Sequence, residues 1–429
     1  MAVPRILVGF ALGVVAVLIV VSLRALASPQ TPLEPGEIVV LTGADDSVGG
    51  QRQRLIDQWN DDHPDNPARL ESLSSEADRQ HSEMVARAQS GASGVDVYNL
   101  DVTWVTEFAA AGFIQPLDGS VNTAGFLAKP LETCGYDGKL WALPFNTDAG
   151  LLYYRTDLVP GGAPPAQIPP TEADMRRLAT GRQMKAGYAG QLGDYEGLTV
   201  NALELIWAAQ GDVVDPDGRV VIDSPEARAG LERLAGAMVA SGGLPPAVLP
   251  ESRTYTERDS TEAFRSGAVA LMRNWPVAYG QLMDDQERAG AGGFDIAKNF
   301  AVTQLPGPSV LGGQNLAIAR DTTKPRAARA LIEFLTSDSS QRRLFRDGGL
   351  PATRHTTYAD ASVREARPYA DILLAAVEDA RPRPRTPHYA LFTAVFQEVV
   401  REALTPSARG RLPADAVSRL TDALNGRLR

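Results

Sequence analysis

The chain has little of what disulfides, metal clusters and nucleic-acid surfaces need. Cys134 is the single cysteine in 429 residues, so neither an intrachain disulfide nor a thiolate metal cluster can form. None of the four histidines has the i, i+4 spacing of a helical metal pair. Lysine is scarce, no basic stripe is visible, and the formal net charge is −10. The sequence therefore predicts no metal, no cofactor and no nucleic-acid partner.

Signatures of catalysis are also missing. There is no Gly-x-Ser-x-Gly elbow and no glycine-rich phosphate loop. Asp and Glu together number 52, so counting cannot exclude a glycosidase pair, but no pair stands out. The composition, 44% hydrophobic and 22% charged, is that of a globular protein with one large core or two. We expect a protein that is not an enzyme.

The amino terminus contains a long apolar run. Arg5 precedes residues 6–23, which are apolar apart from Gly and Ser, and Ala25-Leu26-Ala27 follows. A basic start, an apolar middle and a small-x-small exit are typical of a cleavable signal peptide. The run also approaches the roughly 20 residues of a spanning helix, which predicts an uncleaved membrane anchor. Both interpretations place residues 28 onward outside the cytoplasm, and the lack of cysteine near residue 27 argues against a lipoprotein.

A Pro-rich tether at 28–36 precedes alternating strand and helix signals. Strands are predicted at 38–41, 69–73 and 95–100, and helices at 51–61, 76–89 and 103–111. This rhythm indicates an α/β lobe with a mostly parallel sheet. Farther along, strands are predicted at 186–192, 268–273, 300–305 and 316–319. Helices are predicted at 172–178, 198–210, 225–240, 260–265, 325–335, 340–345, 369–380, 391–403 and after Pro413.

The stretch from Lys139 to Leu158 does not read as an ordinary buried strand. It is apolar at both ends, but its centre contains polar or flexible residues at 146, 147, 148 and 150. Buried polar groups need partners, so a plain core strand has no use for them. Pro144 should end the first strand, because proline cannot donate to a ladder. We interpret the stretch as a hinge segment that lines a ligand cleft.

Five short motifs occur in one order along the chain. They are Val95-Asp96-Val97 before residues 101–104, residues 138–144 followed by 152–158, residues 262–275, residues 312–315 and residues 327–335. In this order they resemble the extracellular solute-binding proteins of sugar ABC importers, especially the maltose- and trehalose-binding branch. The resemblance covers the chain from about residue 37 to the end.

The resemblance implies a two-lobed, periplasmic-binding-protein-like type II fold of the α/β class, with mixed sheets flanked by helices. Its three hinge crossings would lie near 144–150, 312–317 and 379–386. One lobe would comprise 37–145 with 316–378, and the other 146–313 with 386–429. The implied function is non-catalytic: a monomer captures a di- or oligosaccharide between the lobes and delivers it to the permease subunits of an ABC importer.

A sugar offers hydroxyl pairs and an apolar face, so its binder needs acid or amide acceptors, an arginine donor and an aromatic platform. Asp101 ends a strand, where α/β proteins bind ligands, although it could instead cap a helix. Asp148, with Asn146 and Thr147, is a candidate contact, or else ties the hinge backbone. Trp275 resembles the family's stacking tryptophan, with a core role as the alternative.

Two glycines and two arginines extend the candidate set. Gly312 and Gly313 would let a sugar ring approach the backbone, or serve only as hinge glycines. Arg383 resembles a late arginine of the family that reaches the cleft. Arg385 is its main rival, Arg381 is another, and a solvated basic loop is the alternative.

Four weaker candidates are Asp45 and Asp46, in the first strand-to-helix loop, and Gln80 and Tyr389. Trp104 and Trp141 are assigned to the core. One feature departs from the family pattern, because an apolar segment replaces the cysteine-linked lipid anchor of Gram-positive relatives. The alternative function is therefore a membrane-anchored extracellular sensor or receptor that reuses the fold without transport.

Overall fold

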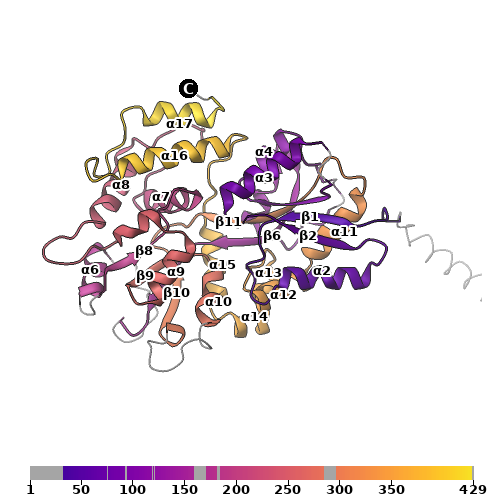
Figure 1. Cartoon of the computed structure of the whole chain (residues 1–429), viewed down its shortest axis with the longest axis horizontal. Helices are drawn as coiled ribbons and strands as arrows, with labels where there is room; N and C mark the ends of the chain where they lie inside the picture. The colour runs from indigo at the N-terminus through magenta and orange to yellow at the C-terminus, as the bar shows by residue number, and fades with distance from the viewer. Residues whose placement is uncertain are drawn as a thin grey trace, which may run out of the picture.

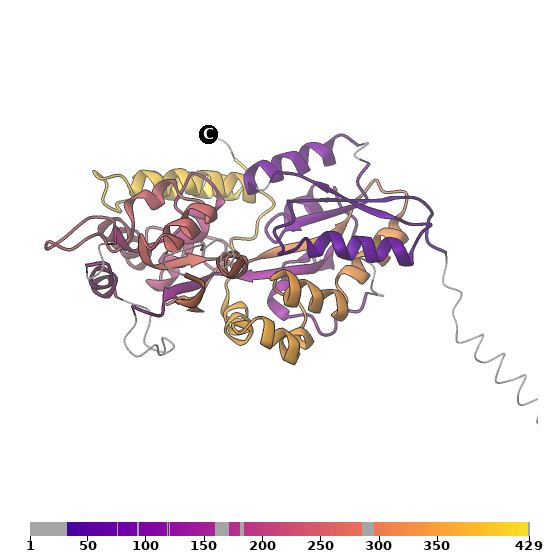
Figure 2. The same cartoon turned by 60° about the horizontal axis from the view of Figure 1, so that its bottom comes forward.

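The computed structural model describes residues 32–427 except 75, 92–93, 118, 120, 159–170, 181–183 and 285–295. The predicted signal or anchor segment and the first four residues of the tether, 28–31, lie outside these residues. Among the helices of the described part, none is long and apolar enough to cross a membrane. The chain forms two lobes, which are apparent in Figure 1 and remain so in the turned view of Figure 2.

The first sheet has five strands in the order β2-β1-β3-β11-β6. They are β1 (Ile38–Thr42), β2 (Ala68–Ser72), β3 (Val97–Asp101), β6 (Ala142–Ala149) and β11 (Leu311–Ile318). β1 is parallel to β2 and β3, whereas β11 is antiparallel to β3 and β6. The sheet is therefore mixed, and the expectation of a mostly parallel sheet holds only for its first three strands.

Helices cover both faces of this sheet (Figure 1). They are α2 (Gln51–Asp62), α3 (Ala77–Gln89), α4 (Val105–Ala110), α5 (Ala128–Glu132), α11 (Pro325–Leu335), α12 (Asp338–Gly348), α13 (His355–Ala359) and α14 (Ala361–Ala366). The helix predicted at 51–61 is confirmed as α2, and its Leu55, Ile56 and Trp59 are buried in the same apolar core as Leu331 of α11. A small ribbon of β4 (Gly135–Tyr136) and β5 (Lys139–Leu140) precedes β6.

The second sheet has four strands in the order β10-β7-β9-β8. They are β7 (Leu151–Arg155), β8 (Ala186–Ala189), β9 (Val269–Asn274) and β10 (Phe300–Gln304). Its helices are α6 (Glu172–Thr180), α7 (Glu196–Ala208), α8 (Pro225–Ala237), α9 (Glu257–Arg265), α10 (Val277–Asp284), α16 (Tyr389–Ala403) and α17 (Ala416–Leu424). Helix α15 (Ala370–Asp379) packs against both β10 of this sheet and β6 of the first. Helices α7, α8, α16 and α17 share one apolar core.

The chain passes between the sheets at β6 and β11, which lie between the two lobes in Figure 1. Ala149 pairs with Leu311 at the end of the first sheet, and after Gly150 the chain enters β7 of the second. A third segment lies alongside, because the Leu311 N–H donates to the Arg381 carbonyl at 2.9 Å. The lobe boundaries given above remain predictions.

Two local predictions about these strands are wrong. Pro144 does not end a strand, because β6 runs without a break from Ala142 to Ala149. A register shift in β11 leaves Phe145 without an opposite residue, and such an irregularity accommodates a proline. Likewise, the strand predicted at 316–319 begins earlier, because residues 312–315 already lie inside β11. Gly313, with φ of 121°, takes a backbone conformation that side chains disfavour.

Candidate ligand-binding site

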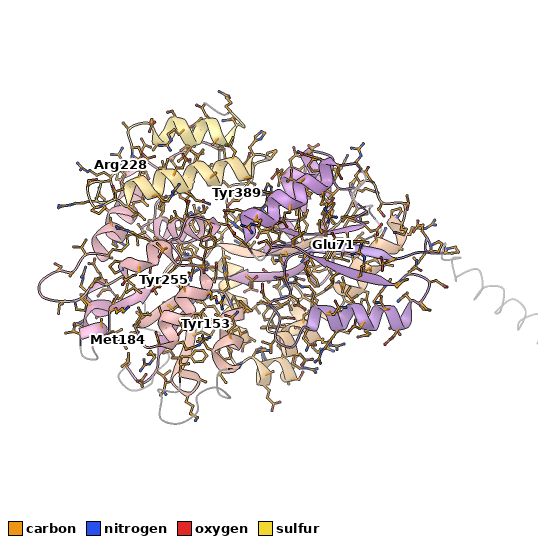
Figure 3. All side chains as sticks on the ribbon, in the orientation of Figure 1. Glu71, Tyr153, Met184, Arg228, Tyr255 and Tyr389 are labelled. Carbon is orange, nitrogen blue, oxygen red and sulfur yellow. The ribbon has the colours of Figure 1, made fainter. Side chains whose placement is uncertain are left out.

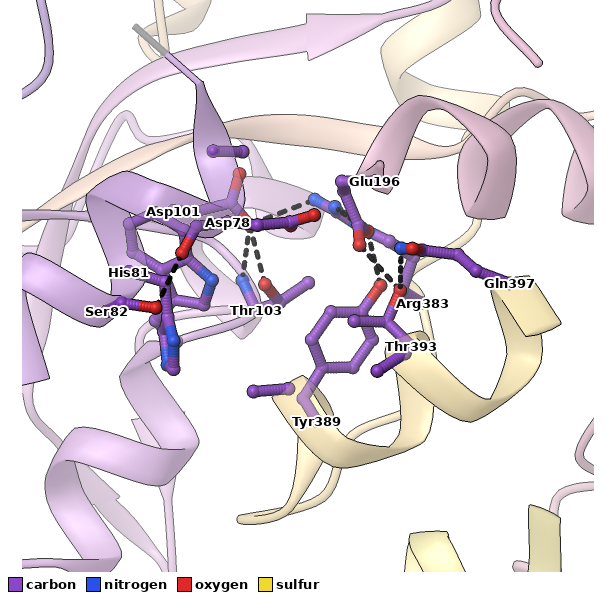
Figure 4. A pocket seen from close by; sticks show the side chains of 14 residues that line it. Asp78, His81, Ser82, Asp101, Thr103, Glu196, Arg383, Tyr389, Thr393 and Gln397 are labelled. Atoms are coloured by element: carbon purple, nitrogen blue, oxygen red, sulfur yellow. Dashed lines mark hydrogen bonds and ion pairs between the residues drawn. The ribbon is translucent and has the colours of Figure 1, made fainter. Parts of the chain in front are cut away.

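A cavity of about 200 Å³ lies where the two lobes meet. One wall comes from α3 and the end of β3, and the other comes from the start of α7 and from α16 (Figure 4). Figure 3 shows Tyr389 at the end of α16 that approaches the other lobe. The polar lining is Asp78, His81, Ser82, Asp101, Thr103, Glu196, Arg383, Tyr389, Thr393 and Gln397.

Asp101 is the last residue of β3, and its carboxylate lines the cavity. The Asp101 Oδ1 accepts hydrogen bonds from the Thr103 N–H at 2.9 Å and the Thr103 hydroxyl at 2.7 Å. The same oxygen lies 3.0 Å from Arg383 Nη2. Asp101 is not the N-cap of α4, because that helix begins at Val105. The two hydrogen bonds from Thr103 hold the Asp101 carboxylate in place at the end of β3.

Arg383 connects the two walls of the cavity. Its side chain is buried, and it donates to Asp101 on one side and to Glu196 Oε1 on the other, at 2.7 Å. Burial alone would lower the pKa of Arg383, but the carboxylates of Asp101 and Glu196, with the Tyr389 phenol, raise it above its ordinary value. The guanidinium therefore stays charged between two acids from opposite walls.

The other two arginines of this loop do not line the cavity. Arg385 donates to the Gly135 carbonyl and lines a different surface pocket, near His388. Arg381 pairs with Asp212 and lies over the Trp207 ring. Of the three arginines that the sequence could not rank, the structure therefore places only Arg383 in the lining of the cavity.

Glu196 is the most connected cavity residue that sequence reasoning missed. Its carboxylate accepts from Arg383, from the Tyr389 hydroxyl and from the Thr393 hydroxyl at 2.7 Å. The predicted helix began at Leu198, whereas α7 begins at Glu196. An acidic residue in the first turn of a helix was the available signal.

Three further residues line the cavity although the sequence analysis did not assign them to the site. Asp78 of α3 was not predicted, and partial shielding from water together with the Glu196 carboxylate raises its pKa to about 6. His81 was dismissed as a metal ligand and is bonded to Glu107 at 2.7 Å. Trp104 is buried, as expected for a core residue, yet it also lines the cavity.

A row of polar side chains leads from Asp101 toward the hinge. In the strand register, Asp101 of β3 is opposite Gln314 of β11, which is opposite Asn146 of β6. Side chains of directly opposed residues share one face of a sheet, so the three form a row. Asp148 lies on the same face, two residues beyond Asn146. We name Asp148, Asn146 and Gln314 the hinge row.

Burial dominates the chemistry of the hinge row. It raises the pKa of Asp148 to about 7, although a hydrogen bond from the Asn146 amide at 3.3 Å opposes the shift. Asn146 is buried, and its Oδ1 has no hydrogen-bond partner among the described residues. A buried acceptor without a partner is unfavourable, so a ligand hydroxyl would find a ready acceptor here.

Buried donors support the other end of the row. Gln314 Oε1 accepts from the Asn99 amide at 3.1 Å and from Arg52 Nη2 at 3.4 Å. Both donors also reach the Thr42 hydroxyl, at 2.9 and 3.0 Å. These residues were not among the sequence candidates, and they fix the Gln314 side chain in place.

Thr147 and the two glycines make backbone contacts in the described structure. Thr147 is fully buried, on the face of β6 opposite to Asn146, and its N–H donates to the Pro351 carbonyl at 3.1 Å. A Cβ on Gly313 would lie 2.3 Å from the Asn146 carbonyl oxygen. A Cβ on Gly312 would lie 3.2 Å from the Trp275 ring. Their glycine identity is explained by strand packing.

Trp275 follows β9 directly and is half-buried, so it is not a plain core residue. Its indole N–H donates to Glu257 Oε1 at 3.3 Å, and the Arg273 guanidinium lies 3.8 Å from the ring centroid. Glu257 and Arg273 were not predicted. Trp275 does not line the cavity, but Gly312 connects it to the hinge row.

The remaining candidates lie outside the cavity lining. Asp45 accepts from the Ser47 hydroxyl at 2.6 Å and lies 4.0 Å from Arg52 Nε. Asp46 is exposed. Gln80 is buried against Gly43, where a Cβ would lie 2.7 Å from its amide nitrogen. The first loop is therefore organised mainly by its own contacts.

Comparison with known proteins decides the family. A family model described as bacterial extracellular solute-binding protein matches residues 54–368. A probable ABC transporter-binding protein of Deinococcus radiodurans is 31% identical over 390 residues, covering 86% of this chain and 89% of that protein. This chain belongs to the bacterial extracellular solute-binding proteins. The mannitol-binding protein of Pseudomonas aeruginosa is 24% identical over 356 residues, covering 78% of this chain and 77% of that protein.

Solved structures of solute-binding proteins confirm the fold. Maltose-bound T. maritima MalE3 matches with a TM-score of 0.78 and 28% identity, covering 91% of this chain and 99% of that one. The GacH receptor of Streptomyces glaucescens, solved unliganded and with acarbose, matches with a TM-score of 0.76 and 21% identity, covering 92% and 100%. The predicted family and two-lobed fold are therefore confirmed.

Proposed function

We propose that this solute-binding protein captures a carbohydrate, a di- or oligosaccharide, between its lobes and presents it to the permease subunits of an ABC importer without catalysing a reaction. The observation that carries the proposal is the cavity in which Arg383 joins Asp101 and Glu196 from opposite walls. A ligand that contacts both walls favours the closed arrangement over the open one.

The lining suits a polyhydroxylated ligand. Carboxylates accept hydrogen bonds from pairs of hydroxyls, and a guanidinium donates to ring or hydroxyl oxygens. The cavity supplies both, together with the Thr393 hydroxyl and the Gln397 amide. The excess of acids over bases disfavours anionic ligands, and a neutral sugar satisfies the carboxylates without bringing a charge.

The relatives support this ligand class. Maltose is bound in one of the similar structures and acarbose in another, and a further relative is a mannitol-binding protein. The cavity of about 200 Å³ is smaller than the roughly 300–1,000 Å³ of typical ligand pockets. We therefore propose that the lobes open further to admit a di- or oligosaccharide.

We further propose that the protein works outside the cytoplasm as a monomer, tethered through residues 28–36. Residues 6–23 would then act as a signal sequence or as a membrane anchor. This placement accords with the family, whose members are extracellular solute-binding proteins.

Thermal unfolding of the purified protein against mono-, di- and oligosaccharides and polyols tests the proposal. A specific ligand stabilises the protein by about 2.7 kcal/mol at one hundred times its Kd. The shift should disappear in Arg383→Gln and persist in Arg385→Gln, a matched control in the same loop whose side chain is outside the cavity. If no carbohydrate shifts the transition, or if both variants bind equally, the proposal is wrong.

A further inference from the structure

Trp275 lies against a buried ion pair. The Arg273 guanidinium is 3.8 Å from the Trp275 ring centroid, and its Nε and Nη2 donate to the two oxygens of Glu204 at 2.9 and 2.7 Å. The side chains of Arg273 and Glu204 are only 1% and 7% exposed. Glu204 Oε1 also accepts from the Val310 N–H at 3.1 Å. The pair therefore fixes one face of the indole to the segment that enters β11.

Two other contacts fix the rest of the tryptophan. The indole N–H donates to Glu257, whose other carboxylate oxygen accepts from the Tyr195 hydroxyl at 2.8 Å. The backbone carbonyl of Trp275 accepts from the Tyr153 hydroxyl at 2.8 Å. Arg273 therefore contacts one face of the indole, Glu257 holds its N–H edge, and Tyr153 holds the Trp275 backbone. The residue nevertheless remains half-buried.

The hinge strands make room for this arrangement. A Cβ on Gly150 would lie 2.7 Å from Arg273 Nη2 and 2.8 Å from a Glu204 carboxylate oxygen. A Cβ on Gly312 would lie 3.2 Å from the Trp275 ring. Both glycines lie where the chain passes between the sheets, so the ion pair and the indole pack directly on the crossing segments.

Stability alone does not account for a buried ion pair at this place. Removing two charges from water is costly, and apolar residues of similar volume often serve a core as well or better. An arginine next to a tryptophan does offer a charged, planar support for the ring. Burial by itself would lower the pKa of Arg273, but Glu204 keeps it above its ordinary value, so the support stays charged.

We propose that Glu204 and Arg273 are positioning residues, which hold the Trp275 indole as a rigid platform for a ring of the bound ligand. This inference rests on the proposed carbohydrate function. A platform that is already oriented loses little conformational freedom when a sugar stacks on it, which favours binding. Glu204 would then influence affinity without touching the ligand.

The test compares the wild type with Glu204→Gln and with the double variant Glu204→Gln/Arg273→Met. The double variant removes both charges, so it leaves no unpaired charge in the core if the single variant proves unstable. The control is Asp157→Asn, which removes the Arg155–Asp157 ion pair of 2.7 Å at the other end of β7.

Two measurements are made on each protein. The first is the NMR resonance of the Trp275 indole N–H without ligand, assigned by its loss in Trp275→Phe. The second is the Kd for the saccharide that stabilises the wild type most. We expect both test variants to move or broaden the Trp275 resonance, leave those of Trp59 and Trp141 in place, and weaken binding about tenfold, as loss of an aromatic contact does. The control should change neither readout.

The outcomes separate this inference from the proposed function. A wild type that binds no saccharide overturns the proposed function. If the wild type binds, an unchanged Trp275 resonance or an unchanged Kd in the double variant overturns the positioning role alone. A tenfold loss in the Asp157→Asn control would also overturn it, because the effect would then come from general destabilisation.

Discussion

Asp101 and Asp148 are two acids on the same face of the five-stranded sheet, yet their surroundings differ. Asp101 ends its strand, pairs with Arg383 at 3.0 Å and lines the cavity. Asp148 lies within β6, and burial raises its pKa to about 7. The cavity acid Asp101 pairs directly with a cation, whereas the side-chain hydrogen bond of Asp148 comes from the neutral Asn146 amide. The two aspartates therefore differ in whether a cation is bonded directly to the carboxylate.

The largest effect should come from the backbone of the hinge. Gly313→Ala places a Cβ 2.3 Å from the Asn146 carbonyl at a φ of 121°, so we expect a loss of about 3 kcal/mol in the free energy of unfolding. Urea denaturation measures it. Gly218→Ala is the control, since its φ of 79° is also positive but nothing lies within 4 Å of the added Cβ. Equal losses in both would show that hinge packing contributes nothing.

The next largest loss of stability should come from removing the cation that the two cavity acids share. Arg383→Gln leaves Asp101 and Glu196 without their shared cation, and we expect a loss of about 2 kcal/mol in unfolding free energy at low salt. Arg385→Gln should cost less than about 0.5 kcal/mol, because Arg385 bonds a carbonyl near the surface. Chemical denaturation of the two variants side by side decides this, and similar losses would contradict the role assigned to Arg383.

The hinge row should respond to pH in a defined direction. An acid whose pKa is higher in the folded state, about 7 for Asp148, binds its proton more tightly when folded. Its contribution to stability is therefore lost as pH rises from about 4 to 7. Asp148→Asn cannot ionise, so we expect it to be as stable as the wild type near pH 4 and increasingly more stable than the wild type as the pH rises to 8. Melting curves across this range that show a constant difference would refute the assignment.

The smallest effect should come from Thr147. Its hydroxyl lies 3.5 Å from the Gly312 carbonyl oxygen, which is too long for a strong hydrogen bond. We expect Thr147→Val to cost about 0.5 kcal/mol of stability and to leave the Kd for a saccharide unchanged. Calorimetric titration measures the Kd, and a several-fold weakening would place Thr147 in contact with the ligand after all.

The sequence predicts much of the fold, because apolar periodicity survives wherever a helix or strand packs on a core. The first helix buries Leu55, Ile56 and Trp59, and Ser224 caps α8 by accepting from the Ala227 N–H. Pro144 misled the prediction, because a register shift in the partner strand, which no local pattern reveals, lets β6 continue past it.

The candidate site was harder to predict for a physical reason. Strand ends and loop polarity identify Asp101 and Arg383, but Arg383 also pairs with Glu196, which is 95 residues away from Asp101 in the chain. The raised pKa of Asp78 and the contact of Arg273 with the Trp275 ring likewise depend on neighbours that only the folded protein brings together. Charge pairs across lobes leave no mark in a single sequence.

The most direct test of the central claim is a crystal structure of the protein with the saccharide that stabilises it most. Our account predicts sugar density between the two walls of the cavity, hydrogen-bonded to Asp101 or Glu196 and to Arg383, with a ring near Trp275. Density at any other surface, with the cavity lining unchanged from the unliganded form, would contradict it.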